Sequence, residues 1–544
     1  MKPTVTGDAI DGGPPSVVRL DGTADLPREL LGNKGFGIDA MCRLGLPVPP
    51  AFGITTAVGA DFLRDPDGCL DGVWSEVCAN VRWLEQQCSR TFGGRESPLL
   101  VSVRSGAAQS LPGMLDSVLD VGIDDGVEAA LAAAATPGFA KDTRDRFRRM
   151  YRRIVLDGDE AGSVPDDVYA QLRSAIEAVL ASWRSPRATA YRNHHGLDDL
   201  GGTAVVVQAM VFGNMARNSG AGVLFTRNPM TGAAEPFGEW RPGGQGEDVV
   251  SGTHDVEPIA TLRTAQPRVH QRLLDAADTL ERVWRDVQDV EFTVEDGNLW
   301  LLQTRVAKRS AQAAVRLALA FLDEGLIDEA EALRRVTPAQ VRALLTPSVQ
   351  PETRLAATLL ATGLPACPGV ASGTAYTDVD EALDAADRGE DVILVRPTTT
   401  PDDVHGMVAA LGIVTETGGA ASHAAIVSRE IGRPAVVGCG VGAAAALAGR
   451  AITVDGTEGE VRQGILETSA WSEADTPDLR RLTALARTAS PLRAHDAGAP
   501  FPVLGAPTEA AVRAAMIAGH VDVATTEPLI AMLTAVQIGE AGAG

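Results

Sequence analysis

Short apolar runs alternate with amphipathic stretches along most of this 544-residue chain, and that alternation limits the folds it can adopt. The runs PLLVSVRSG and TAVVVQAMVFG have the length and composition of buried strands, whereas DTRDRFRRMYRRIVLDG spaces its apolar residues as a helix does. Strands that alternate with helices are typical of α/β and α+β domains. We therefore predict a multi-domain α/β protein, because one hydrophobic core rarely serves so long a chain.

Changes in this pattern divide the chain into four regions. Residues 1–345 form one large α/β unit, and residues 346–370 lose periodicity and gain prolines as an interdomain linker does. Residues 371–465 have the order strand, helix, strand, helix, strand, glycine turn, helix, strand, which predicts a compact α/β domain. Residues 466–544 form a tail with helices expected at 477–488 and 507–518.

The net charge restricts the partners of the chain. Acidic residues outnumber basic ones by 71 to 48, for a formal charge of −23, which repels nucleic acid and anionic lipid. No apolar run approaches the ~18 residues of a membrane span, no signal pattern begins the chain, and the six cysteines lack CxxC spacing. We expect a cytoplasmic protein with neither a nucleic-acid nor a membrane partner.

Two glycine-containing segments of the first region have the composition of phosphate-binding loops. In LLGNKGFGIDA, one of only four lysines, Lys34, lies among glycines that let the backbone approach an anion. In VSVRSG, a strand ends at Arg104 and continues into Ser105 and Gly106, which offer hydrogen-bond donors to phosphate oxygens. Alternatively, Lys34 is a solvated side chain in a plain strand-to-helix turn and Arg104 an exposed strand end.

A third segment, DVEFTVEDGNLWLLQTR, predicts a β-hairpin with its turn at EDGN. Period two places Asp289 and Glu291 on one face of the first strand, and Gln303 and Arg305 on one face of the second. Because Mg²⁺ prefers oxygen ligands that it shares with substrate phosphates, Asp289, Glu291 and Gln303 are candidate metal ligands. The alternative is a solvated hairpin face with cross-strand ion pairs.

One of the eight histidines lies in a setting that a packed core does not need. In TETGGAASHAAIVSREIG, Gly418 and Gly419 permit a sharp turn after a strand, and Ser422 can cap a helix that begins at His423. The N-terminus of a helix presents unpaired N–H groups and a positive dipole end, which suit a phosphoryl group on the histidine ring. We predict that His423 is a nucleophile that carries phosphate.

The order of these motifs resembles the pyruvate phosphate dikinase family, within the group that includes phosphoenolpyruvate synthase and the rifampicin phosphotransferases. The resemblance covers nearly everything to residue 465, including VVVQAMVFGNMARNSGAGVLFTRNPMTGAAEPFGEW and TTTPDDVHGMVAALGIVTETGGAASHAAIVSREIGRPAVVGCG. It implies an ATP-grasp-like nucleotide-binding domain over 1–345 and a swivelling phosphohistidine domain, the PEP-utilising mobile domain, over 371–465.

The resemblance also implies roles for individual residues. His423 would take the β- and γ-phosphates of ATP with release of AMP, and inorganic phosphate would then remove the outer group as pyrophosphate. ATP would be the substrate, with Mg²⁺ as cofactor. The residues that would contact MgATP are Lys34, Arg104, Asp289, Glu291, Gln303 and Arg305, with Glu239 of PFGEW beside them.

The sequence departs from the family in two places. The family continues into a (β/α)₈ barrel that binds phosphoenolpyruvate or pyruvate, whereas residues 466–544 resemble only the first strand, helix and second strand of that barrel. We therefore expect a C-terminally truncated form. The family pattern RGGMTSHA reads TGGAASHA, with Thr417 in place of the arginine and Ala421 in place of the threonine. Arg396 or Arg429 is a candidate to replace the missing guanidinium.

The leading prediction is an ATP-dependent phosphotransferase of the dikinase type that carries the ATP and phosphate half-reaction. Its final acceptor would be bound by a separate barrel-bearing chain or would be another small molecule. One alternative is a stand-alone small-molecule kinase that acts through phosphohistidine, and another is a non-catalytic nucleotide-sensing protein. A monomer is favoured, because dimer contacts in the family come largely from the barrel.

Overall fold

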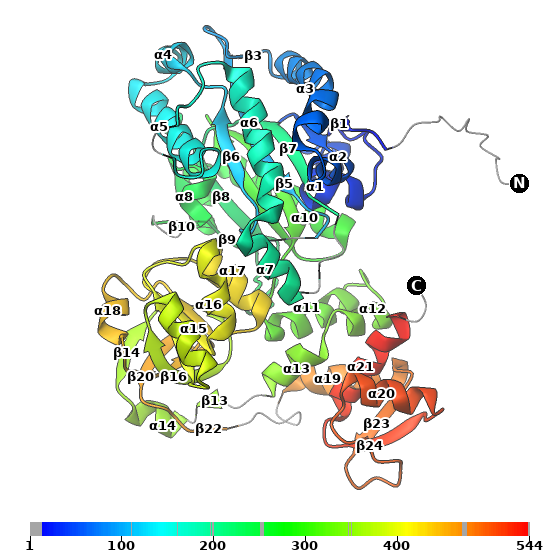
Figure 1. The fold of residues 1–544 in the computed structure, drawn as a ribbon. Helices are drawn as coiled ribbons and strands as arrows, with labels where there is room; N and C mark the ends of the chain where they lie inside the picture. Colours follow the sequence, from blue (N-terminus) through cyan, green and yellow to red (C-terminus); the bar gives the residue numbers. More distant parts are fainter. Residues whose placement is uncertain are drawn as a thin grey trace, which may run out of the picture. The chain divides into compact units, whose positions relative to one another are not determined.

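A computed structural model describes most of the chain and divides it into two compact units. The described residues are 14–109, 111, 113–159, 162–195, 197, 201–250, 255–345, 348–349, 351–469 and 476–541. The first unit comprises residues 1–219 and 293–305, and the second comprises residues 220–292 and 306–544. The predicted α/β fold class is confirmed, since helices and sheets alternate in both units (Figure 1).

The first unit is built on a five-stranded antiparallel sheet with the strand order β1-β2-β7-β5-β6. Its central strand β7 is buried along its whole length, because α1 packs against β2, β5 and β7, and α6 packs against β5, β6 and β7. The elements are β1 (Val17–Arg19), α1 (Arg28–Arg43), β2 (Ala51–Ile54), α2 (Thr56–Phe62), α3 (Pro66–Cys88), β3 (Thr91–Phe92), β4 (Pro98–Leu99), β5 (Val101–Gly106), β6 (Ser117–Val121), α4 (Asp125–Ala134), α5 (Pro137–Ile154), α6 (Val168–Ala181), α7 (Pro186–His195) and β7 (Ala204–Ala209).

A second sheet has the strand order β10-β9-β8-β11-β12. The predicted hairpin is confirmed, since β11 and β12 are joined through Asp296 and Gly297, which both have positive φ as a two-residue turn of this kind requires. The elements of this stretch are β8 (Gly220–Phe225), β9 (Phe237–Pro242), α8 (Gly246–Val250), β10 (Glu257–Pro258), α9 (Leu262–Ala265), α10 (Pro267–Trp284), β11 (Gln288–Glu295), β12 (Asn298–Val306), α11 (Ala311–Asp323), α12 (Glu329–Arg334) and α13 (Pro338–Leu344).

The second unit also contains an eight-stranded mixed sheet with the order β14-β21-β20-β16-β17-β18-β19-β15. Its four strands β16 to β19 run parallel, and α15, α16 and α17 lie beside them (Figure 1). The predicted order of elements over 371–465 is confirmed. These elements are β16 (Val370–Tyr376), α15 (Val379–Asp387), β17 (Val392–Arg396), α16 (Val404–Ala409), β18 (Gly412–Thr415), α17 (His423–Ile431), β19 (Ala435–Val437), α18 (Ala443–Leu447), β20 (Ala451–Asp455) and β21 (Glu460–Gln463).

Part of the segment expected to be a linker is ordered. Strands β14 (Leu359–Thr362) and β15 (Leu364–Cys367) form the two edges of the eight-stranded sheet, and the short helix α14 (Pro351–Ala356) precedes them. The linker interpretation is wrong for these strands, because their backbone groups pair with β21 and β19. Strand β13 (Ser348–Val349) pairs with β22 (Thr468–Ser469), and residues 346–347 and 350 lie outside the described residues.

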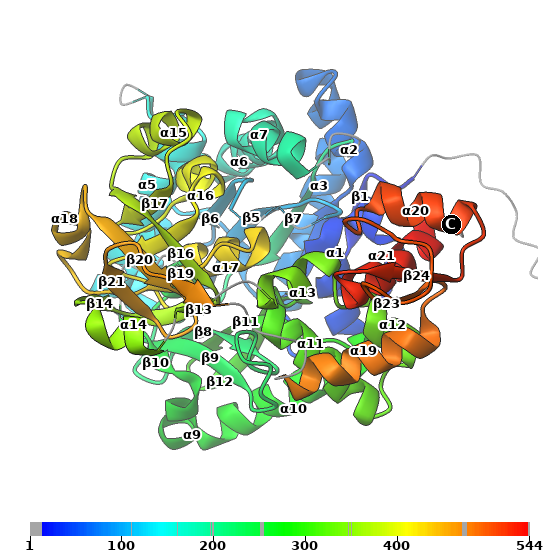
Figure 2. The ribbon, with the colours of Figure 1, turned by 90° about the horizontal axis from the view of Figure 1, so that it is seen from below.

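The C-terminal segment is a compact helical part of the second unit. Helices α19 and α21 pack against α11, α12 and α13 (Figure 1, Figure 2), and α21 is buried on nearly all sides. The two predicted helices are confirmed, and strands β23 and β24 pair in parallel around α20. The elements are α19 (Pro477–Ala489), β23 (Arg493–Asp496), α20 (Glu509–Ile517), β24 (Asp522–Thr525) and α21 (Pro528–Ala541); residues 470–475 and 542–544 of the predicted tail lie outside the described residues.

No helix among the described residues is both long enough and apolar enough to cross a membrane. The longest helix, α3, is amphipathic and carries charged residues along its length.

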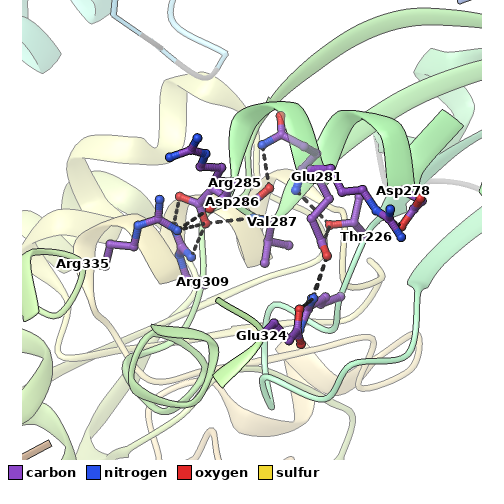
Figure 3. A network of polar contacts seen from close by, with 12 residues as sticks. Thr226, Asp278, Glu281, Arg285, Asp286, Val287, Arg309, Glu324 and Arg335 are labelled. Carbon is purple, nitrogen blue, oxygen red and sulfur yellow. Dashed lines mark hydrogen bonds and ion pairs between the residues drawn. The ribbon is translucent and has the colours of Figure 1, made fainter. Parts of the chain in front are cut away.

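A buried ion cluster connects the turn between α10 and β11, the segment before α11 and the end of α12 in the second unit (Figure 3). The carboxylate of Asp286 accepts two hydrogen bonds from Arg309, at 2.7 and 2.8 Å, and Arg335 lies 3.7 Å from the same carboxylate. Only 9% of Asp286 is exposed, so its charge depends on these two guanidinium groups. The cluster fixes the start of β11, the strand that carries Asp289 and Glu291.

Replacing Asp286 with alanine is expected to lower the free energy of unfolding by about 3 kcal/mol, because the largely buried Arg309 loses its counter-charge, whereas Arg335 keeps its ion pair with Glu331. The matched control is Asp278→Ala, which removes an exposed carboxylate from an i,i+4 pair with Arg282 and should cost less than about 0.5 kcal/mol. Urea unfolding followed by circular dichroism measures both. Equal midpoints for the two variants would contradict the role of the cluster.

Candidate functional site

The turn before His423 has the form that the sequence predicts. Gly418 has a φ of 125°, which a side chain would strain, and Ser422 accepts a hydrogen bond from the N–H of Ala425 as the N-cap of α17. His423 is the first residue of that helix. The turn therefore presents the imidazole at the positive end of a helix.

The carboxylate of Glu239 lies against this turn. Its Oε1 accepts a hydrogen bond from the N–H of Ala420 at 3.2 Å, and the N–H of Ala421 also donates to the carboxylate. A Cβ at Gly419 would collide with both carboxylate oxygens, so glycine is needed for this approach. Oε2 of Glu239 is buried without a hydrogen-bond partner. Burial raises the pKa of Glu239, and the two N–H groups and Arg429 oppose the shift.

The two nitrogens of His423 differ in their surroundings. Nε2 is buried and has no hydrogen-bond partner, whereas the ring hydrogen bonds to the backbone of Thr400. Burial lowers the pKa of His423, and the Asp403 carboxylate and the Thr400 backbone act in the opposite direction. The imidazole is consequently neutral at neutral pH, and a neutral ring is what a nucleophile requires.

The two arginines considered as replacements for Thr417 lie in different places. Arg429 is 5% exposed, and its guanidinium donates to the carbonyls of Ala420, inside the turn, and Ala366, at 2.9 and 3.2 Å. Arg396 ends β17 and lies 3.2 Å from Asp403. Arg429 thus supports the backbone of the turn, and Arg396 contacts the carboxylate that acts on the histidine.

Lys34 lies in a helix and not in a glycine loop. Residues Arg28–Arg43 form α1, which is kinked at Gly32, where φ is 69°. The expected loop is wrong because only Gly32 leaves the helical region; Gly35 and Gly37 continue the helix and allow it to pack closely. A Cβ at Gly32 would collide with the carbonyl of Gly106, so the kink brings α1 against the end of β5.

The contacts of α1 bring three of the predicted nucleotide-binding residues into one neighbourhood of the first unit. The Lys34 side chain faces the Gly106 backbone, and Arg104 donates to Oε1 of Gln303 at 3.3 Å. Helix α1 also approaches β12, where a Cβ at Gly37 would lie 3.1 Å from the Thr304 carbonyl. Ser105 follows Arg104 on β5 and is 6% exposed. Lysine, arginine and amide groups gathered in this way suit a polyphosphate.

The remaining predicted residues lie on the hairpin strands. Asp289 and Glu291 are on β11, where Asp289 is 3% exposed and Glu291 is partly exposed, and Arg305 is near the end of β12. Within the part of the chain that the structure describes, no group of three or more His, Cys, Asp or Glu residues forms a metal site. Asp289 and Glu291 belong to the second unit and Gln303 to the first, so their assignment as Mg²⁺ ligands stays a prediction.

Two sets of contacts around His423 and its helix α17 were not predicted from the sequence. Thr400 and Asp403 form a capping box, and the pattern T-x-x-D could have indicated it. Lys308 donates to Oε1 of Glu430 on α17 at 2.8 Å, a contact between residues 122 positions apart that no local pattern signals.

Comparison with known protein families finds two matched regions. Residues 71–272 match the AMP/ATP-binding domain of pyruvate phosphate dikinase, and residues 388–459 match the mobile domain of PEP-utilising enzymes. The first region contains Arg104 and Glu239, and the second contains Arg396, Asp403 and His423.

Curated relatives extend the similarity over most of the chain. The chain is 39% identical to pyruvate, phosphate dikinase of Rhizobium meliloti over 513 residues, and 38% identical to that of Clostridium symbiosum over 511 residues. These alignments cover 82% and 83% of this chain but 57% and 58% of the relatives. Pyruvate, phosphate dikinase 2 of Zea mays is 38% identical over 76% of the chain and 51% of its own length. The chain is a homologue of these enzymes and spans just over half of their length.

The buried carboxylate of Glu239 should make stability depend on pH in a defined direction. A carboxylate whose folded pKa is raised contributes stability below its unfolded pKa of about 4.5 and loses it as pH rises through the folded pKa. The melting temperature of Glu239→Gln minus that of wild type should therefore increase as pH rises from 4 to 7.5. Glu235→Gln, at an exposed position, should show no such trend. A constant difference for Glu239→Gln would contradict the burial of its charge.

Proposed function

We propose that this homologue of the pyruvate, phosphate dikinases transfers phosphate from MgATP to His423 and releases AMP. The observation that supports the proposal most directly is the state of the imidazole, whose Nε2 is buried without a partner while the rest of the ring is held by a hydrogen bond. A neutral ring with one nitrogen lone pair available is a competent nucleophile toward phosphorus.

The proposed reaction has two steps. The Nε2 lone pair attacks the β-phosphorus of ATP, a nitrogen–phosphorus bond forms, and the bond from that phosphorus to the oxygen bridging the α-phosphate breaks. AMP leaves with the electron pair of that bond. An oxygen of inorganic phosphate then attacks the outer phosphorus, and the bond from that phosphorus to the oxygen bridging the inner phosphorus breaks. Pyrophosphate leaves, and one phosphoryl group, which keeps the electron pair of that bond, remains on His423.

The nucleotide would be held by the cluster around Lys34, Arg104 and Gln303. The guanidinium and ammonium groups would neutralise phosphate oxygens, and Ser105 would add a hydroxyl donor beside Gly106, whose own N–H donates to Oγ1 of Thr203. We propose Asp289, Glu291 and Gln303 as the ligands of Mg²⁺, with Arg305 beside them. When bound, the metal would neutralise charge that develops on the phosphate oxygens.

Glu239 would act at the histidine turn as well as in the nucleotide domain. Its carboxylate occupies the N–H groups of Ala420 and Ala421, donors that otherwise suit a phosphate oxygen. We propose that Gly418, Gly419 and Ser422 shape this turn, and that Arg429 supports it through the Ala420 carbonyl.

The proposal is confined to the ATP and phosphate half-reaction. The relatives are named for pyruvate as well as phosphate, and this chain spans just over half of their length. We propose that the acceptor of the histidine phosphate is bound by a separate chain that carries a barrel, or is a small molecule.

Intact-protein mass spectrometry at alkaline pH tests the covalent step. Wild type incubated with MgATP should gain two phosphoryl groups without inorganic phosphate and one with it, while chromatography detects AMP. His423→Ala should gain none and form no AMP, whereas His520→Ala, at an exposed histidine of the C-terminal segment, should behave as wild type. Nucleotide binding without AMP or an adduct would overturn the proposal in favour of a nucleotide-sensing protein.

Nucleotide affinity tests the cluster of the first unit. Arg104→Ala should raise the dissociation constant for MgATP by about 10- to 100-fold, because a charge-assisted contact to phosphate is lost. Arg64→Ala removes an arginine whose side chain is 76% exposed, and should leave the constant unchanged. Isothermal titration calorimetry measures both, and an unaltered constant for Arg104→Ala would exclude it from the nucleotide site.

A further inference from the structure

The tautomer of His423 is determined by its neighbours. A neutral imidazole carries one N–H and one lone pair. Nε2 has no partner, so the hydrogen bond to the Thr400 backbone involves Nδ1. This hydrogen bond raises the pKa of the ring, as a bond to a carbonyl oxygen does. A carbonyl only accepts, and Nδ1 therefore holds the proton while Nε2 keeps the lone pair.

The Thr400 backbone is itself held by a buried carboxylate. Oδ2 of Asp403 accepts two hydrogen bonds from Thr400, one from its N–H at 2.6 Å and one from its hydroxyl at 2.9 Å. Asp403 is 4% exposed. The carbonyl that orients the histidine thus belongs to a residue bound at two points, which limits its movement.

The charge of Asp403 is balanced by Arg396 at the end of β17. The guanidinium lies 3.2 Å from the other carboxylate oxygen, Oδ1, and also donates to the Thr377 carbonyl at 2.7 Å. Arg396, Asp403, Thr400 and His423 therefore form one continuous series of contacts within the second unit. The series begins at the end of the parallel strand β17 and ends at the imidazole.

Capping alone does not account for this arrangement. The 3₁₀ turn Pro401–Asp403 is only three residues long, and an exposed carboxylate would cap it without the cost of desolvation. A buried carboxylate held by a partly exposed counter-charge is the kind of partner that elsewhere orients a functional histidine through its second nitrogen. A purely structural cap would affect stability and leave the tautomer unchanged.

We propose that Asp403, supported by Arg396, is a positioning residue that holds His423 in the Nδ1–H tautomer and so assigns phosphoryl transfer to Nε2. The inference deepens the proposed function and rests on it. When the Nε2–phosphorus bond forms, the proton stays on Nδ1 and the ring gains positive charge. The nearby carboxylate of Asp403 stabilises that charge, so it should affect the rate of transfer as well as the geometry.

Nitrogen-15 NMR of histidine-labelled protein measures the tautomer, and rapid quench measures AMP formation in a single turnover. Asp403→Ala should give a mixture of tautomers and a 10- to 100-fold slower turnover, the usual cost of losing such a partner, with the dissociation constant for MgATP unchanged. Asp403→Glu should recover part of the rate. Asp384→Ala, an exposed carboxylate of α15, should match wild type in both readouts.

A second variant, Asp403→Asn, keeps the test decisive if Asp403→Ala does not fold. Asp403→Asn retains an oxygen that can accept from Thr400 but loses the ion pair with Arg396, so it should fold and still react about tenfold more slowly. An Nδ1–H tautomer and a wild-type rate in either Asp403→Ala or Asp403→Asn would overturn the inference. If wild type forms no AMP, the proposed function fails, whereas the NMR comparison of the variants still decides whether Asp403 sets the tautomer.

Discussion

The contact between Glu239 and the turn before His423 is the interaction on which the candidate site depends. It joins a strand of the nucleotide-binding region to the helix that carries the histidine, across 181 residues of sequence. A carboxylate there contacts two backbone N–H groups, the donors that a phosphate oxygen would otherwise take. The Glu239 carboxylate can reach these donors because Gly419 has no Cβ to block its approach.

Arginine carries most of the electrostatic organisation of this acidic chain. The formal charge is −23 and lysines are few, so anionic sites are balanced by particular guanidinium groups: Arg309 with Asp286, Arg396 with Asp403, and Arg429 with the turn. Arg309 and Arg429 are largely buried, Arg396 is partly exposed, and each donates in a fixed direction, which suits the orientation of a loop or a carboxylate. Lys308, by contrast, meets the single carboxylate of Glu430 as a point charge.

Local patterns predicted the elements that depend on local forces. The hairpin at Asp296 and Gly297, the helix that begins at His423 and its cap at Ser422 follow from turn chemistry, period and capping preference. The surroundings of Lys34 could not be predicted in this way. Whether Gly35 and Gly37 belong to a loop or a helix depends on the close approach of β5 and β12, which is a tertiary contact.

The surroundings of His423 could not be predicted either, because they depend on partners that are far away in sequence. The choice between Arg396 and Arg429 could not be made from the sequence, since it depends on which of them reaches Asp403 and which the turn. The capping role of Asp403 could have been predicted from the sequence, because Asp403 ends a T-x-x-D pattern. Its burial could not. The predicted linker was wrong where β14 and β15 pair with strands far away in sequence.

The central claim is that ATP forms a covalent bond to His423 with AMP as the leaving group. Isotope exchange tests it most directly: the protein is incubated with MgATP and radiolabelled AMP, without inorganic phosphate. Because the first step is reversible, label should pass from AMP into ATP in wild type and not in His423→Ala. Unlabelled ATP in the wild-type reaction, with the protein folded and the nucleotide bound, would contradict the account.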